Sequence, residues 1–311
     1  MKIAVTTIAF SKNKLLRENI KIKFSEVKFN NLGKRLSHEF LIDFLKDSEV
    51  AVIGLDIINE KTLEKLPNLR CIVKYGVGLD NIDLDACKKR NIEIGWEGGV
   101  NKKAVAEIAL GFMISLSRNI SLSSKKMSKG IWDKNGGSSL SELTIGILGF
   151  GFIGKEIAKL LSIFGCKILV NDIIDFTDHC KSKNYLFVNK SELFAKSDII
   201  TIHTSLNDST KNLFNLKSFS LMKKTPYLIN TARGGIIDEN ALVDAIKNKK
   251  IKGAALDVFE HEPLTNKNIF ESPNIICTPH ISGNSNEAII KMGMSSIQFV
   301  EKYYQNKYGK V

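Results

Sequence analysis

Residues 144–154 read Thr-Ile-Gly-Ile-Leu-Gly-Phe-Gly-Phe-Ile-Gly and place glycines at positions 149, 151 and 154. A β-rich run precedes the first of these glycines, and residues 155–164 have helical character. A second apolar run, 167–170, follows and ends in Asn171 and Asp172. A strand, a glycine turn, a helix and a further strand form the context that a dinucleotide-binding fingerprint requires. The segment therefore predicts a Rossmann unit.

Each position of this fingerprint has a physical reason. Gly149 permits the tight turn, Gly151 lets a pyrophosphate approach the backbone, and Gly154 allows the helix to pack closely on the strand. The start of the helix offers the backbone N–H groups of Phe152 and Ile153, together with the positive end of the helix dipole. We expect these residues to bind the phosphates of a dinucleotide.

The cofactor is predicted to be NAD because of Asp172. This residue ends the second strand, where a carboxylate can accept hydrogen bonds from both ribose hydroxyls. The same charge repels the 2′-phosphate of NADP. The following residues, Ile173-Ile174-Asp175, provide no arginine to compensate.

The rest of the chain also alternates β-rich runs with helical patterns, which predicts an α/β protein with doubly wound parallel sheets. A length of 311 residues suits two domains. In the first part, strands are expected at Lys2–Thr6, Lys21–Phe29, Val50–Ile53, Cys71–Lys74 and Ile92–Gly95.

A glycine-containing break at 97–101 separates this part from a long apolar helix, 103–124, after which the alternation resumes at residue 144. A final helix, from about 284 to 304, can return to the first part. We therefore expect a flavodoxin-like substrate domain at 1–100, completed by 284–311, and a Rossmann NAD-binding domain at 101–283.

Composition and charge narrow the class of protein. The net charge is +12, but only six of the 45 basic residues are arginine, and the lysines are scattered along the whole chain. Nucleic-acid readers rely on arginine forks, so no nucleic-acid partner is expected. No apolar run approaches the length of a membrane span, so no membrane partner is expected either. Five cysteines without C-x-x-C spacing favour a reducing cytoplasm.

Arg233, Glu262 and His280 each follow a predicted strand in the last third of the chain. The carboxyl ends of parallel strands meet at one edge of a sheet, so these three residues can lie together. A planar cation, a carboxylate and an imidazole are suited to binding a carboxylic acid and moving a proton. With a nucleotide at the same edge, the combination predicts a redox enzyme. No cluster of metal ligands is visible in the sequence, so no metal is expected.

The chain resembles the D-isomer-specific 2-hydroxyacid dehydrogenases, a family that includes phosphoglycerate dehydrogenases and glyoxylate/hydroxypyruvate reductases. Besides the glycine fingerprint, the resemblance rests on five segments in family order. They are Gly76-Val-Gly-Leu-Asp-Asn-Ile-Asp83, Asn101-Lys-Lys-Ala-Val-Ala-Glu107, Ile229-Asn-Thr-Ala-Arg-Gly-Gly235, Ala255-Leu-Asp-Val-Phe-Glu-His-Glu-Pro263 and Thr278-Pro-His-Ile281.

The resemblance implies a role for each matching residue. His280 is expected to be the acid/base, Glu262 its partner that orients the ring and favours its charged form, and Arg233 the substrate anchor. Asp257 is expected to hold the nicotinamide carboxamide. His203 ends the run 198–202, where it either borders the cofactor or packs as a structural histidine.

The first domain is expected to contribute substrate contacts as well. The resemblance implies that the backbone of Gly76, Val77 and Gly78 grips the substrate carboxylate, with Asn101 nearby. It also implies a homodimer in which the helix 103–124 lies at the interface.

The chain departs from the family pattern in two places. Thr204-Ser205-Leu206 stands where a proline-containing turn is usual, and no arginine stands at 53–56, where many phosphoglycerate dehydrogenases read the substrate phosphate. Lys74 can replace that cation or can be a solvated charge, and Asp56 opposes a phosphate. The chain ends at Val311, so no appended regulatory domain is expected.

The predicted activity is the interconversion of a small D-2-hydroxy acid and its 2-keto acid by NAD-dependent hydride transfer. The favoured substrate is 3-phosphoglycerate or a similarly small anionic 2-hydroxy acid. Glyoxylate or hydroxypyruvate reduction is the alternative within the family. Formate dehydrogenases typically have Gln at the position of Glu262, which argues against that activity. An NAD-sensing corepressor is the non-enzymatic alternative.

Overall fold

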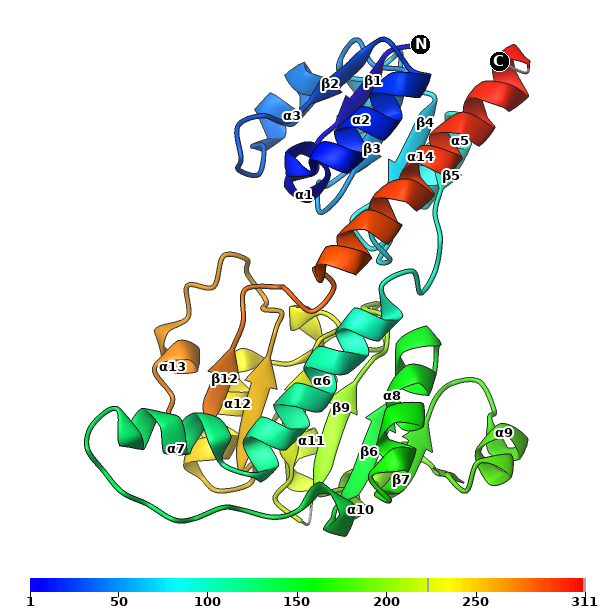
Figure 1. Cartoon of the computed structure of the whole chain (residues 1–311). Coiled ribbons are helices and arrows are strands. Elements are labelled where there is room, and N and C mark those ends of the chain that lie inside the picture. The colour runs from blue at the N-terminus through cyan, green and yellow to red at the C-terminus, as the bar shows by residue number, and fades with distance from the viewer. Residues whose placement is uncertain (223, 310–311) are drawn as a thin grey trace. The chain divides into compact units, whose positions relative to one another are not determined.

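A computed structural model of the chain describes residues 1–222 and 224–309. By its internal contacts the chain divides into two compact units, Met1–Asn101 together with Gly283–Val311, and Lys102–Ser282 (Figure 1). Each unit contains one parallel sheet, as expected for an α/β protein of this class.

The first unit is built on a five-stranded parallel sheet in the order β2-β1-β3-β4-β5. Its strands are β1 (Ile3–Val5), β2 (Val27–Phe29), β3 (Val50–Ile53), β4 (Cys71–Lys74) and β5 (Glu93–Gly95). The strands β1, β3 and β4 are buried along their whole length, which is typical of a sheet covered on both faces. Because β3 and β4 pair with Ile53 opposite Lys74, the loops that follow these strands are neighbours.

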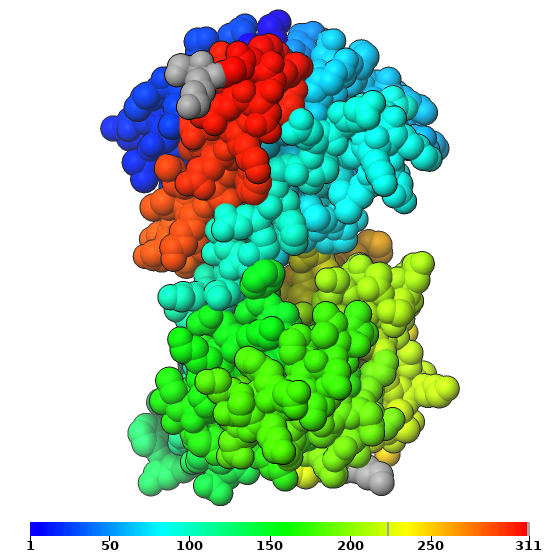
Figure 2. Space-filling model, turned by 90° about the vertical axis from the view of Figure 1, so that its right-hand side faces the viewer, coloured from blue at the N-terminus to red at the C-terminus, as the bar shows by residue number. Residues whose placement is uncertain are grey.

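Helices cover this sheet and include the end of the chain. They are α1 (Ile8–Lys12), α2 (Lys14–Lys23), α3 (His38–Leu45), α4 (Glu60–Glu64), α5 (Leu84–Lys89) and α14 (Asn286–Tyr308). The helix α14 packs against α2 and β4, and Figure 2 shows it, in orange and red, at the surface of this unit. The approach to α2 is close, because a Cβ on Gly293 would lie 2.2 Å from the side chain of Leu16.

The second unit is built on a seven-stranded parallel sheet in the order β12-β11-β10-β9-β6-β7-β8. Its strands are β6 (Thr144–Leu148), β7 (Lys167–Asn171), β8 (Leu186–Phe187), β9 (Ile199–Ile202), β10 (Tyr227–Asn230), β11 (Gly253–Leu256) and β12 (Ile275–Cys277). The chain runs outward from β6 through β7 to β8 and then crosses to β9 on the other side of β6. Such a reversal of strand order is the switch point at which doubly wound proteins bind their ligands.

The helices of this unit are α6 (Lys102–Ser117), α7 (Ile120–Met127), α8 (Phe152–Ile163), α9 (Thr177–Ser182), α10 (Lys190–Lys196), α11 (Leu216–Ser220), α12 (Glu239–Lys247) and α13 (Lys267–Phe270). The short 3-10 segments are η1 (Leu140–Glu142) and η2 (Gly234–Ile236). Among the described residues no single helix is long and apolar enough to cross a membrane. The pair α6 and α7 passes that test only when taken together, and it is bent by 61°.

Two predicted elements differ from the structure. The predicted strand 21–29 is wrong in its first half, because residues up to Lys23 belong to α2 and only Val27–Phe29 pair with β1. The predicted helix 103–124 is two helices, α6 and α7, separated at Arg118-Asn119. Asn119 has a φ of +55°, a left-handed conformation that cannot continue a right-handed helix.

Candidate active site

The glycine turn between β6 and α8 leaves no room for side chains at two of its three glycines. Gly149 has a φ of +92°, and a Cβ there would lie 2.6 Å from the carbonyl of His203. A Cβ on Gly154 would lie 2.2 Å from the carbonyl oxygen of Gly149. Gly151 has no atom within 4 Å of its Cβ position, so open space lies at the start of α8. That space is where a phosphate group can approach the backbone.

The start of α8 is suited to binding an anion. No described side chain makes a cap hydrogen bond at its N-cap, Gly151, so the first N–H groups of the helix are not capped from the side. Asp172, at the end of β7, accepts hydrogen bonds from the amides of Phe150 at 2.5 Å and Ile174 at 2.9 Å. The carboxylate is thereby held beside the glycine turn, which is the position that a ribose-binding carboxylate requires.

Buried polar atoms without a described partner lie near the same edge of the sheet. They are Nδ1 of His203, Oγ1 of Thr231 and Oγ of Ser282. His203 and Thr231 directly follow β9 and β10. Buried polar atoms are rarely left without a hydrogen bond, so these atoms fit an edge that receives a polar ligand such as the nicotinamide end of NAD.

His203 lies against the glycine turn but is poorly suited to proton transfer. Its Nε2 forms a 2.7 Å hydrogen bond with Oγ1 of Thr201, and its amide donates to the carbonyl of Leu148. Burial lowers the pKa of His203 to about 3, so the ring stays neutral at neutral pH. These contacts are compatible with both roles expected for His203, bordering the cofactor and structural packing.

Arg233 is placed by the turn after β10. The side chain of Asn230 accepts a hydrogen bond from the amide of Ala232 at 3.0 Å and donates one to the carbonyl of Arg233 at 2.8 Å. The next residue, Gly234, packs directly on the loop that carries Glu262. A Cβ on Gly234 would lie 1.9 Å from the carbonyl carbon of Phe259, so only glycine fits there.

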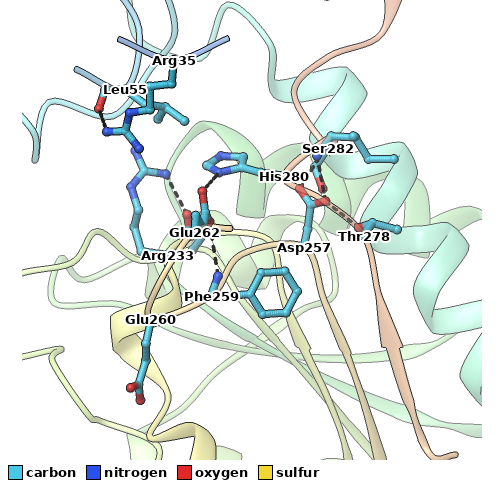
Figure 3. Close-up of polar contacts among 12 residues, drawn as sticks. Arg35, Leu55, Arg233, Asp257, Phe259, Glu260, Glu262, Thr278, His280 and Ser282 are labelled. Carbon is cyan, nitrogen blue, oxygen red and sulfur yellow. Dashed lines mark hydrogen bonds and ion pairs between the residues drawn. The ribbon is translucent and has the colours of Figure 1, made fainter. Parts of the chain in front are cut away.

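Glu262 and His280 form a direct contact. The Nδ1 atom of His280 lies 2.8 Å from Oε2 of Glu262. The His280 side chain is 30% exposed and the Glu262 side chain 26%. Figure 3 shows Arg233, Glu262 and His280 pointing toward one another. Because Nδ1 faces the carboxylate, Nε2 lies on the side of the ring away from Glu262.

The environment keeps Glu262 ionised. Burial by itself raises the pKa of Glu262, but the hydrogen bond and charge of His280 lower it. The amide of Phe259, which donates to Oε1 at 3.3 Å, and the charge of Arg233 also lower it. The pKa of Glu262 therefore lies below its ordinary value, and the group is a carboxylate throughout the neutral pH range.

The backbone of His280 is strained. Its φ is +54°, in the left-handed region that residues other than glycine, Asn and Asp seldom adopt. Such a conformation costs on the order of 1–3 kcal/mol and persists only where the surroundings hold it. Asp257, which directly follows β11, is fully buried beneath this loop.

The predicted substrate residues of the first unit lie in the loops after β3 and β4. Lys74 is buried, and its Nζ donates to the carbonyl of Gly54 and, at 2.5 Å, to Oδ1 of Asn81. Asp56 is also buried, and its Oδ2 accepts from the hydroxyl of Thr6 at 2.5 Å. Lys74 is thus not a solvated charge, and Asp56 is held by donors inside the unit. The solvated-charge alternative for Lys74 is therefore wrong, and the expected repulsion of a phosphate by Asp56 remains a prediction.

The other predicted residues of this unit are either more exposed or have a buried polar atom without a described hydrogen-bond partner. Gly76, with a φ of +114°, and the adjacent Val77 and Gly78 are half-buried. The carbonyl of Val77 accepts a 2.7 Å hydrogen bond from the indole of Trp96. The Oδ1 atom of Asn101 is buried without a described partner.

Arg35 is a candidate that sequence reasoning missed. It follows β2, is exposed, and donates to the carbonyl of Leu55, in the segment 53–56 that itself contains no arginine. Among the described residues it has no carboxylate partner in any ion pair. No signal in the sequence connects position 35 with position 55, because only the folding of the β2 loop brings them together.

Comparison with known proteins identifies the family. The model of the D-isomer specific 2-hydroxyacid dehydrogenase NAD-binding domain matches residues 110–282. Glyoxylate reductase of Thermofilum pendens is 40% identical over 82% of this chain and 78% of its own length. The chain belongs to the D-isomer-specific 2-hydroxyacid dehydrogenases. It is therefore an NAD-dependent oxidoreductase, and the predicted family, fold class and cofactor are confirmed.

Further relatives include enzymes of different specificity. D-3-phosphoglycerate dehydrogenase of Methanocaldococcus jannaschii is 34% identical over 81% of this chain but only 49% of its own length. The crystal structure of D-lactate dehydrogenase from Aquifex aeolicus, complexed with NAD and lactic acid, has a TM-score of 0.88 at 27% identity. That similarity covers 98% of this chain and 96% of the other. Family membership therefore leaves the substrate open.

The glycine turn yields a matched pair of predictions. In Gly154→Ala the new methyl group meets the carbonyl of Gly149, so we expect loss of stability together with weaker NADH binding. In Gly151→Ala the methyl group enters open space, so the melting temperature should be preserved while NADH binding weakens. Thermal unfolding and fluorescence titration with NADH measure the two effects. Undiminished NADH binding by Gly151→Ala would contradict the assignment of the phosphate site.

The contact between Glu262 and His280 predicts a change in pH dependence. Reduction of a keto acid requires a protonated imidazole, and the carboxylate of Glu262 stabilises that charged form. In Glu262→Gln this stabilisation is lost, so the fall in kcat/KM with rising pH should begin at lower pH. A pH profile of NADH-dependent reduction measures the shift. An unchanged high-pH limb would contradict a partnership between Glu262 and His280 in proton transfer.

Proposed function

We propose that Arg233, Glu262 and His280 form the catalytic centre of this dehydrogenase. The observation that carries the proposal is the 2.8 Å contact between His280 and Glu262, with Arg233 directed toward the same carboxylate. All three follow strands of the sheet whose switch point holds the glycine turn. This is the edge at which a bound nucleotide and a substrate can meet.

Each of the three residues has a separate role in carbonyl reduction. The guanidinium of Arg233 can bind the substrate carboxylate through two N–H groups and polarise the carbonyl as negative charge develops on its oxygen. The imidazolium of His280 donates a proton from Nε2 to that oxygen and takes it back in the reverse direction. Glu262 stabilises the charged ring and fixes its orientation through Nδ1. NADH, when bound, supplies the hydride that reaches the carbonyl carbon.

Oxidation of NADH with a panel of 2-keto acids tests this function. We expect turnover of at least one small keto acid by the wild-type enzyme and none of formate with NAD. Arg233→Lys keeps the charge but loses the planar fork, so kcat/KM should fall by about 10²-fold or more with near-normal NADH binding. Wild-type efficiency in this variant would contradict the role of Arg233. Binding of NADH without turnover of any acid would instead favour the corepressor-like alternative.

We further propose that the substrate is 3-phosphoglycerate or a similarly small 2-hydroxy acid with a second anionic group. The support lies in the loop Gly54–Leu55 of the first unit. Lys74 donates to its Gly54 carbonyl, and the exposed guanidinium of Arg35 donates to its Leu55 carbonyl. This loop adjoins the Gly76–Gly78 segment, because β3 and β4 are neighbours. Relatives that reduce glyoxylate support the alternative of an unphosphorylated substrate.

The two cations predict different outcomes when each is replaced. Arg35→Met should lower kcat/KM for 3-phosphoglycerate about tenfold or more and change that for unphosphorylated glycerate much less, because water can replace its exposed bond to the Leu55 carbonyl but not its charge. Lys74→Met should impair both acids, because its ammonium group also holds the loop. Arg90→Met, which removes another exposed arginine of the same unit, is the control. Equal or better use of glycerate, glyoxylate or hydroxypyruvate by the wild type would overturn the phosphate proposal.

We also propose that the protein is a homodimer joined through the second unit. The helix α7 buries none of its residues within the chain. Together with the segment after it, α7 exposes large apolar side chains, of which Trp132 is 75% exposed. Covering such a surface by a second copy removes apolar area from water.

Light scattering at micromolar concentration should give twice the chain mass of 34.7 kDa. Trp132→Glu places a charge in the proposed interface and should shift the protein toward the monomer, whereas Lys134→Glu nearby should not. A monomeric wild type would refute the proposal.

A cytoplasmic location is proposed from the cysteines. All five are free thiols, and three of them are buried. Burial, with a smaller contribution from nearby carboxylates, raises the pKa of Cys71 to about 12, which makes this thiol unreactive. Inert, unpaired cysteines are typical of proteins that stay in a reducing compartment.

A further inference from the structure

The carboxylate of Asp257 is bonded on both oxygens to the loop that carries His280. Its Oδ1 accepts from the hydroxyl of Thr278 at 2.5 Å and from the amide of Ile281 at 2.8 Å. Its Oδ2 accepts from the amide of Ser282 at 2.8 Å. The Asp257 side chain therefore spans the loop from the residue two before His280 to the residue two after it (Figure 3).

The backbone of Asp257 adds two further bonds. Its carbonyl accepts from the amide of His280 at 2.9 Å, and its own amide donates to the carbonyl of Asn230 at 3.0 Å. Asn230 is the residue whose side chain shapes the turn of Arg233. Asp257 thus connects the histidine loop to the arginine turn through a continuous set of hydrogen bonds.

These bonds hold a conformation that His280 would not adopt by itself. With a φ of +54°, His280 lies in the left-handed region, which disfavours residues other than glycine. The amides of the next two residues, Ile281 and Ser282, both donate to the carboxylate of Asp257. If those bonds were lost, the loop could relax toward ordinary φ values and rotate the ring away from Glu262.

We infer that Asp257 is a positioning residue for proton transfer, acting on His280 through the backbone of residues 278–282. The inference rests on the proposed role of His280 as the acid/base. The resemblance assigns Asp257 to the nicotinamide carboxamide, and that assignment remains a separate prediction. A side chain with 0% exposure and three donors on its carboxylate is arranged to hold the loop.

Three variants separate this role from cofactor binding. Asp257→Asn keeps the shape but turns an acceptor into a donor that faces backbone N–H groups. Thr278→Val removes only the hydroxyl that donates to Oδ1, whereas Thr278→Ser keeps it and is the matched control. Each variant is measured for thermal stability, NADH affinity by fluorescence titration, and kcat for the keto acid over a range of pH.

The inference predicts a graded effect on proton transfer. Asp257→Asn should lower kcat by about 10²-fold, as expected when a catalytic group is misplaced. Thr278→Val should lower kcat by about tenfold, the equivalent of one hydrogen bond. Thr278→Ser should match the wild type. In both impaired variants the pH profile of reduction should also shift. In Thr278→Val, which leaves the Asp257 carboxylate in place, NADH affinity should change by less than about threefold.

A spectroscopic measurement tests the inference without any turnover. The chain has five histidines, so the imidazole region of its NMR spectrum is small enough to assign. The Nδ1 proton between His280 and Glu262 should give a downfield signal that disappears in Glu262→Gln. It should be lost or displaced in Asp257→Asn and Thr278→Val and retained in Thr278→Ser. If the wild type proves inactive with every keto acid, the proposed function fails, but this signal still decides the role of Asp257.

Two results would overturn the inference. One is an unchanged His280 signal and pH profile in Asp257→Asn and Thr278→Val, accompanied by weaker NADH binding, which would make Asp257 a cofactor ligand. The other is a loss of thermal stability alone, with kcat and the signal preserved in the folded Thr278→Val protein, which would make the contacts merely structural.

Discussion

The parallel pairing of β9, β10, β11 and β12 is the constraint on which the site depends. In this register Asn230 lies opposite both Ile202 and Leu256, and Leu256 lies opposite Cys277. The residues that follow these strands therefore emerge at one edge, side by side. His203, Arg233, Asp257 and the loop of His280 are all placed by this pairing before any side-chain contact is considered. Separation in sequence is irrelevant at that edge, because strand spacing alone sets the distances.

Close backbone packing then brings the loops within hydrogen-bonding distance. Gly234 presses on the carbonyl of Phe259, which draws the arginine turn onto the loop of Glu262. The same loop is tied to the start of α12, where the amide of Glu239 donates to Glu260 and the amide of Glu260 donates to Glu239. These paired contacts restrict the motion of both loops, so the segments that carry the reacting groups cannot move independently. Precision of this kind is what catalysis by positioning requires.

Two histidines at this edge show how environment determines chemistry. His203 is enclosed, and its burial keeps the ring neutral. His280 is partly exposed, and its Nδ1 lies 2.8 Å from the carboxylate of Glu262. The first ring can therefore pack or donate a hydrogen bond, whereas the second is the ring for which we propose proton transfer. The left-handed backbone conformation of His280 is energetically unfavourable, and the hydrogen bonds of Asp257 offset this cost.

Local sequence patterns were sufficient to predict the fold class, the family, the cofactor and the residues proposed for the site, because alternating hydrophobic periods and the glycine spacing are local signals. It could not decide where the strand before residue 29 begins or that the helix after residue 102 breaks at Asn119. Local propensity is weak at such boundaries, and tertiary packing overrides it. Only the tertiary structure placed Arg35 at the Leu55 loop, buried Lys74 and turned Asp257 toward the histidine loop. Each of these depends on contacts between segments far apart in the chain, which no pattern of neighbouring residues encodes.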